Sequence, residues 1–158
     1  MTPSNYREKL EQKRQIIETC LEQKVGRYQE LRKARKQSVA DLSEPQELDR
    51  QSQSESIREE LFEELLNGSV QLDALVWEIE LLQNLRADKL YAQVQLGAVV
   101  KTDQRNFLVA VGHPQFQVAG EQYVGISTQS PLLRFAQGLI RGDSFMVANR
   151  TYLIREVF

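Results

Sequence analysis

The sequence predicts an α+β protein in two parts, a long α-helical hairpin followed by a small antiparallel β-sheet with one short helix. Two stretches, 10–35 and 57–82, carry apolar residues at the heptad spacing of an antiparallel coiled coil. After Leu85 the apolar period changes to two, as in a half-buried strand. We therefore expect a coiled-coil hairpin over 1–86, with an acidic tip near 41–47, and a sheet domain over 92–158.

The two heptad stretches define the expected seam of the hairpin. Pairing them about a fold-back near residue 46 places Lys24 opposite Gly68, with room for the lysine stem and with Glu64 receiving its charge. A leucine at position 68 should then collide with the facing helix. The seam positions of the first arm are Leu10, Arg14, Ile17, Leu21, Lys24, Tyr28, Leu31 and Arg35, and those of the second are Ile57, Leu61, Leu65, Gly68, Leu72, Leu75, Ile79 and Leu82.

The second half of the chain reads as short strands around one helix. Strands are expected at 93–98, 107–111, 122–127, 144–147 and 151–157, with Asn149 suited to the positive φ of a tight turn between the last two. The helix is expected over 130–138, with Ser130 as N-cap, Pro131 at the first helical position and Gly138 near the end. This pattern predicts an antiparallel sheet covered by a single short helix.

Composition indicates a soluble protein of the cytoplasm. The single cysteine, Cys20, excludes an internal disulfide and is compatible with a reducing compartment. No apolar run reaches the ~18 residues of a membrane span, and the start of the chain lacks the apolar centre of a signal peptide.

Charge is distributed unevenly along the chain. Residues 1–40 carry ten Lys or Arg against five Asp or Glu, residues 41–80 carry two against twelve, and residues 81–158 carry eight against five, so the local balances are +5, −10 and +3. One interpretation is a solvated coiled coil whose basic arm is neutralised by glutamates at 59–64 of the facing arm. The other is that Arg32, Lys33 and Lys36 track a nucleic-acid backbone.

Two acids lie where the hairpin is expected to turn. Asp41 and Glu44 are three residues apart, which puts them on one side of a helical turn or cap. Carboxylate oxygens are the protein ligands that Mg²⁺ prefers. The alternative is structural, with Asp41 in a loop after the first helix and Glu44 as a favourable charge before a second helix that begins at Pro45.

Several of these segments resemble the bacterial Gre transcript cleavage factors. Residues 40–48 read Ala-Asp-Leu-Ser-Glu-Pro-Gln-Glu-Leu and are similar to that family's tip, Gly-Asp-Leu-Ser-Glu-Asn-Ala-Glu-Tyr. Residues 126–132 and 138–143 resemble its Ile-Ser-x-x-Ser-Pro-(hydrophobic) and Gly-Lys-x-x-Gly-Asp segments, and 151–157 resemble its final strand. The similar segments follow one another in the family's order, hairpin first and sheet second.

The resemblance implies a transcription elongation factor that has no active site of its own. An FKBP-like C-terminal domain would dock on core RNA polymerase through Ser130, Pro131, Leu132 and Arg134, and the coiled coil would enter the secondary channel. There, Asp41 and Glu44 would help hold a second Mg²⁺ of the polymerase, which would cleave backtracked RNA near its 3′ end. No other cofactor is implied.

Three tip residues depart from the family pattern, and they keep other functions open. Ala40, Pro45 and Leu48 stand where the family has Gly, Asn and Tyr, and Pro45 disfavours a helical backbone at Glu44. One alternative is a Gre-like regulator that binds polymerase without stimulating cleavage. The other is a structural coiled-coil adaptor, which would need neither the tip acids nor a docking surface.

Overall fold

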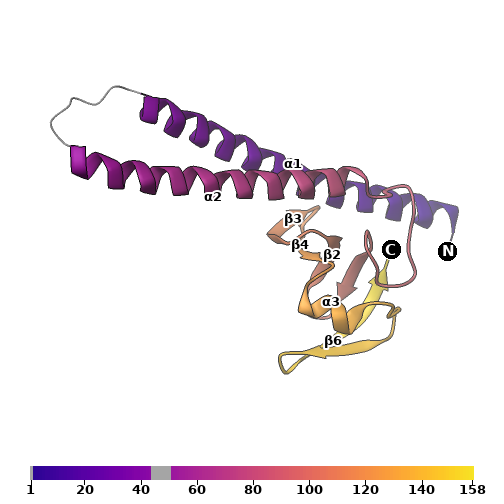
Figure 1. The fold of residues 1–158 in the computed structure, drawn as a ribbon. Coiled ribbons are helices and arrows are strands. Elements are labelled where there is room, and N and C mark those ends of the chain that lie inside the picture. Colours follow the sequence, from indigo (N-terminus) through magenta and orange to yellow (C-terminus); the bar gives the residue numbers. More distant parts are fainter. Residues whose placement is uncertain (1, 44–50) are drawn as a thin grey trace. The chain divides into compact units, whose positions relative to one another are not determined.

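The computed structural model describes residues 2–43 and 51–158, with side chains for 2–40 and 59–158, and has an α+β fold (Figure 1). Two long helices are followed by a six-stranded sheet and one short helix. The elements are α1 (Pro3–Ser43), α2 (Gln51–Gln83), β1 (Val99–Thr102), β2 (Asn106–Ala110), β3 (His113–Val118), β4 (Glu121–Ser127), α3 (Pro131–Ala136), β5 (Ser144–Val147) and β6 (Arg150–Val157). Among the described residues, no helix combines the length and apolar character needed to cross a bilayer.

The chain packs as two compact units. One contains Met1–Glu22 and Glu80–Phe158 and is called the sheet unit below; the other, Gln23–Ile79, is called the hairpin unit. The first turns of α1 therefore pack with the sheet, because Ile16, Ile17 and Cys20 are buried in the same apolar cluster as sheet residues. The heptad pattern alone does not reveal this division, since one apolar stripe can cover either a helix or a sheet.

The sheet has the strand order β3-β4-β2-β1-β6-β5. All its pairs are antiparallel except β2 with β4, which is parallel, so the expectation of a wholly antiparallel sheet was wrong at this pair. The parallel pair arises because β3 is inserted between β2 and β4 in the chain and lies at the edge of the sheet. The sequence analysis predicted no strand at the position of β3.

The strand expected at 93–98 is also absent from the described structure, where Gln93 forms only an isolated bridge with Ile140. Gly97 adopts a φ of +88°, which breaks an extended backbone, and the first regular strand begins at Val99. The strands expected at 107–111, 122–127, 144–147 and 151–157 correspond closely to β2, β4, β5 and β6.

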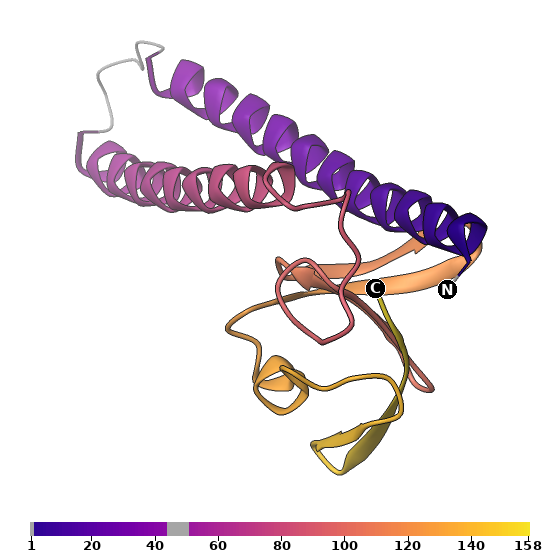
Figure 2. The same ribbon diagram turned by 90° about the vertical axis from the view of Figure 1, so that its right-hand side faces the viewer.

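Apolar side chains of the sheet alternate between two buried clusters. Val99 and Leu108 belong to the cluster that also contains Ile16 of α1, whereas their neighbours Val100 and Phe107 belong to the cluster that contains Leu133 of α3. The two faces of the sheet are therefore covered by different helices. Figure 2 shows the first part of α1 running across one face.

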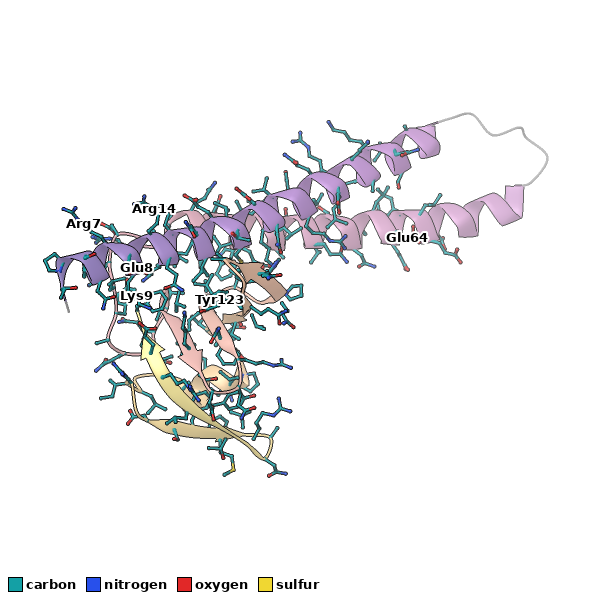
Figure 3. All side chains as sticks on the ribbon, turned by 180° about the vertical axis from the view of Figure 1, so that it is seen from behind. Arg7, Glu8, Lys9, Arg14, Glu64 and Tyr123 are labelled. Carbon is teal, nitrogen blue, oxygen red and sulfur yellow. The ribbon has the colours of Figure 1, made fainter. Side chains whose placement is uncertain are left out.

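Polar contacts fasten the first part of α1 to the sheet unit. Lys9 Nζ lies 2.6 Å from Glu156 Oε1, and Gln12 Nε2 donates a hydrogen bond of 3.2 Å to the Tyr123 hydroxyl. Lys9 and Tyr123 lie between helix and sheet in Figure 3, whereas Arg14 lies on the opposite side of the helix. Arg14 is exposed, so its assignment to a buried seam was wrong. The heptad pattern assigns this part of α1 to the seam between the two helices, whereas in the structure it packs on the sheet.

The helices of the hairpin unit pair in a different register from the expected one. Lys24 Nζ lies 2.6 Å from Glu78 Oε2, and Glu78 is ten residues beyond Gly68, since 78 − 68 = 10. A Cβ added at Gly68 would meet no atom within 4 Å. The expected packing of Lys24 against Gly68 and Glu64 was therefore wrong, because reflecting the two arms about a fold-back near residue 46 assumes two straight helices in contact along their whole length.

The local turn chemistry of the sheet unit agrees with the sequence. Asn149 has a φ of +62° and Ala148 has a φ of +49°, which is the backbone of a tight two-residue hairpin between β5 and β6. Ser130 occupies the N-cap position of α3 and Pro131 the first turn, although the Ser130 side chain makes no capping hydrogen bond. Gly138, just beyond the helix, has a φ of +80°. These three sequence predictions are confirmed.

Candidate functional site

The acidic tip lies at the limit of the described structure. Asp41 belongs to the last turn of α1, which ends at Ser43, and its side chain is not described. Glu44, with the rest of the expected tip up to residue 47, lies outside the described residues. The pairing of the two carboxylates therefore stays a prediction from the sequence.

A basic hollow of about 430 Å³ lies on the hairpin unit, on the part of α1 that leads to Asp41. The residues of α1 that line it fall within about 100° of one another around the helix, because adjacent helical residues are about 100° apart and the other separations are three, four, seven, eight or eleven positions. Leu72 of α2 completes its wall. The lining residues are Tyr28, Arg32, Arg35, Lys36, Val39 and Leu72, and we call them the basic hollow.

The cations of the basic hollow are free to act on an external ligand. Arg32, Arg35 and Lys36 are exposed, and within the described side chains no ion pair joins any of them to a carboxylate. The glutamates at 59–64 of α2 therefore do not neutralise these cations by direct contact. Three cations beside the half-buried ring of Tyr28 form a surface on which phosphates are held by charge and a base can stack.

The structure revises the predicted set of nucleic-acid contacts. Arg32 and Lys36 line the basic hollow as expected, whereas Lys33 is exposed but does not line it. Arg35 was assigned to the helical seam and instead lines the hollow. Tyr28 was also assigned to the seam, and it too lines the hollow. Arg35 lies three residues after Arg32 and therefore on the same side of the helix, and this spacing could have identified it from the sequence.

The predicted docking segment forms the exposed side of α3. Leu133 and Ala136 are buried against the sheet, and Leu132 is half-buried beside them. Pro131 and Arg134 are exposed, and Ser130, at the N-cap, is half-buried. The segment thus offers a mixed surface of which Leu132 is the least accessible part.

Phe135 is the main apolar residue of this surface that was not among the predicted docking residues. Its ring is 57% exposed, because Leu133 and Ala136 fix the inward side of a six-residue helix and Phe135 then points outward. The sequence showed that the three large apolar residues of α3 cannot all face inward, but not which would remain outside. The exposed part of α3, which we call the α3 surface, consists of Pro131, Arg134 and Phe135.

A second hollow, of about 370 Å³, lies on the sheet unit. Its only carboxylate, Glu121, lies 2.7 Å from Lys101 Nζ and accepts a 3.0 Å hydrogen bond from the Tyr123 hydroxyl. The hydrogen bond from Lys101 holds the pKa of Glu121 below its ordinary value, so this acid stays ionised and paired. The lining is polar and contains no aromatic ring: Thr102, Gln104, Arg105, Asn106, Gln115, Glu121, Gln122 and Val124.

Across residues 2–43 and 51–158, no three His, Cys, Asp or Glu side chains gather as a metal site would require. The expected Mg²⁺ belongs to a partner's active site, so it would not need such a group in this chain. A comparison with protein-family models finds no match for the chain, and no curated protein matches it either.

Proposed function

We propose that this protein is a Gre-type transcription elongation factor that binds RNA polymerase and stimulates its cleavage of backtracked RNA. The basic hollow carries the proposal. Its cations are exposed and unpaired among the described side chains, and Lys36 precedes Asp41 by five residues on the same helix, since 41 − 36 = 5. A surface that attracts phosphates thus adjoins an acidic tip on one rod-like element.

In this proposal, the chemistry of each surface determines its role. The α3 surface, on an FKBP-like domain, docks on core polymerase. The two helices act as a coiled coil in the secondary channel, and the basic hollow holds the phosphate backbone of the displaced RNA. Asp41 and Glu44 supply oxygen ligands to a second Mg²⁺ of the polymerase, and that ion orients the attacking water. The chain itself is then not an enzyme.

The second candidate function is a Gre-like regulator that binds polymerase without stimulating cleavage. Pro45 favours it, because the residue before a proline avoids helical backbone and the carboxylate of Glu44 is then aimed differently from the family's. Such a regulator would keep the α3 surface and the basic hollow.

The deciding experiment measures RNA cleavage in a stalled elongation complex with and without the protein. We expect wild-type protein to stimulate cleavage and Asp41→Asn or Glu44→Gln to reduce it about tenfold or more, equivalent to about 1.4 kcal/mol of activation free energy. Higher Mg²⁺ or Mn²⁺ should restore part of the activity, because mass action fills a weakened ion site. The exposed Glu60, changed to Gln, is the matched control and should leave cleavage unchanged.

The same assay separates the three functions. Polymerase binding with uncut transcripts across the whole range of metal concentration would identify the regulator. Failure of the wild-type protein to bind core polymerase at all would leave the structural adaptor.

A further inference from the structure

A stripe of large apolar side chains runs along α2 and is exposed among the side chains that the structure describes. Phe62, Leu66, Val70 and Trp77 succeed one another at intervals of four, four and seven residues, which places them on one side of the helix. Each residue is more than half exposed, with accessible fractions of 62, 55, 69 and 61% in that order. We call these four residues the α2 stripe.

The α2 stripe is long enough to seat another helix. Phe62 and Trp77 are fifteen residues apart, since 77 − 62 = 15, which corresponds to about 22 Å or four helical turns. Anchors repeated at these intervals are the usual means by which one helix packs along another. The core-facing residues Leu72 and Leu75 of the same helix are buried, so the stripe is a second apolar face rather than part of the hairpin core.

The charges around the stripe select the kind of partner. Residues 59–79 contain six acids, at 59, 60, 63, 64, 73 and 78, and no Lys or Arg. Glu59 and Asp73 lie in line with the stripe, at three residues before Phe62 and three residues after Val70. A helix seated here meets carboxylates along its length, which favours Lys and Arg at its margins.

Three other occupants fit the stripe less well. Stacking the α2 stripe of a second copy on this one would bring two rows of carboxylates together. The basic α1 of a second copy has the right charge, but its seam residues Tyr28 and Leu31 are already half-buried in its own hairpin unit. An anionic membrane surface would repel the acids of the stripe in the same way as a second α2.

We propose that the α2 stripe is the docking site for a basic amphipathic α-helix of another protein. The partner's apolar side chains pack between Phe62, Leu66, Val70 and Trp77, and its basic margins lie against Glu59, Glu63 and Asp73. This interaction is independent of the proposed role in transcript cleavage, since it uses neither the α3 surface nor the basic hollow.

The only tryptophan of the chain, Trp77, lies in the stripe and reports its occupancy directly. The probe is a synthetic amphipathic peptide of about 18 residues made of Leu and Lys, long enough for about five helical turns. Titrating it into the full chain should shift Trp77 emission to the blue and reduce quenching by acrylamide. A peptide with Glu in place of every Lys should give neither effect, and added salt should weaken the Lys peptide.

Variants of the stripe test whether the signal comes from docking. Leu66→Gln and Val70→Gln should each weaken peptide binding tenfold or more, while circular dichroism stays unchanged. Met146→Gln changes an equally exposed apolar residue of the sheet unit and should leave the affinity unaltered. Asp73→Asn should weaken binding severalfold, and more so at low salt.

Three outcomes would overturn the proposal. Trp77 emission that does not respond to the Lys peptide would show that the stripe has no affinity for such helices. An equal response to the Glu peptide would remove the role of charge. A blue shift that grows with protein concentration alone, with a doubled mass in sedimentation, would make a second copy the occupant.

Discussion

Lys13 is fully buried, which is unusual for a lysine. Its ammonium group donates a 2.7 Å hydrogen bond to the Lys89 carbonyl and lies 4.2 Å from the centre of the Tyr91 ring. Burial lowers the pKa of Lys13 from 10.5 to about 8, although Asp88 favours the charged form. This side chain ties α1 to the segment that precedes the sheet, and it keeps its charge there at a cost in stability.

The first prediction is a pH dependence of stability that originates at Lys13. The folded-state pKa, about 8, lies below the ordinary value of 10.5, so between them the unfolded chain binds more protons than the folded one and stability rises with pH. The gain should be about 2 kcal/mol between pH 8 and about 9.5. Urea unfolding followed by circular dichroism measures it.

Lys13→Met is the matched variant, because it keeps an apolar stem of similar length without the charge. Its stability should lack this rise, so the stability of the wild type relative to the variant should increase with pH. Burial also raises the pKa of Tyr123, and staying below pH ~10 keeps that group protonated in both states. Parallel pH curves for wild type and variant would show that Lys13 is not the titrating group.

A second prediction concerns Gly125 in the middle of β4. A Cβ at this position would overlap the Val111 carbonyl oxygen and lie 2.8 Å from His113 Cβ, so the backbone itself must move. Gly125→Ala should therefore lower the free energy of unfolding by about 1–3 kcal/mol. Gly112→Ala, at a nearby glycine with open space around it, should change stability far less. Equal effects of both variants would mean that β3 and β4 separate readily at this point.

At the scale of the elements, the long helices contain two glycines that do not contribute to packing. Among the described residues, an added Cβ at Gly26 in α1 or Gly68 in α2 would come within 4 Å of no atom beyond its chain neighbours and the adjacent backbone of its own helix. Glycine in the interior of a helix is less favourable than alanine by about 0.8–1 kcal/mol. This reverses the expectation from the sequence that a side chain at Gly68 would meet the facing helix.

The third prediction follows from this open space. Gly26→Ala and Gly68→Ala should each stabilise the helices by roughly 0.5–1 kcal/mol, and the double variant should show nearly the sum, because the two sites lie on different helices. Thermal unfolding followed by helical circular dichroism is the measurement. A loss of stability at Gly68 alone would restore the register in which Lys24 packs against it.

The short helix α3 illustrates how an element divides its residues between core and surface. With six residues it can bury only one side, and Leu133 and Ala136 occupy that side. Phe135 is apolar, but it is exposed because it lies on the other side of this helix. An exposed ring on a short and well-buttressed helix is a typical anchor for a partner protein.

At the scale of the whole molecule, the proposed docking surface and the proposed acidic tip belong to different units. The fourth prediction is that Phe135→Ser, in the sheet unit, weakens binding to core polymerase, whereas Asp41→Asn leaves that binding unchanged. The expected loss is tenfold or more in affinity. Leu153→Ser, another exposed apolar residue of the sheet unit, is the control. Undiminished binding of the Phe135 variant, measured by surface plasmon resonance, would place docking elsewhere.

The candidate sites were only partly accessible from the sequence. Arg32 and Lys36 could be named because cations on a helix remain near the surface, but Arg35 was assigned to the seam and instead lines the basic hollow. The α2 stripe was not predicted, because its four residues lie outside the predicted seam and single apolar residues are common on a protein surface.

The sequence by itself determined the class of the fold, most of the strands and the turn chemistry. These depend on local preferences, such as Asn149 in a positive-φ turn and Pro131 at the first turn of a helix. Only the tertiary structure decided the parallel pairing of β2 with β4 and the pairing of Lys24 with Glu78. Only the tertiary structure, too, assigned the first turns of α1 to the sheet. Each of these joins residues far apart in the chain, and an apolar side chain is stabilised by any apolar surface that excludes water, so its pattern in the sequence does not specify its partner.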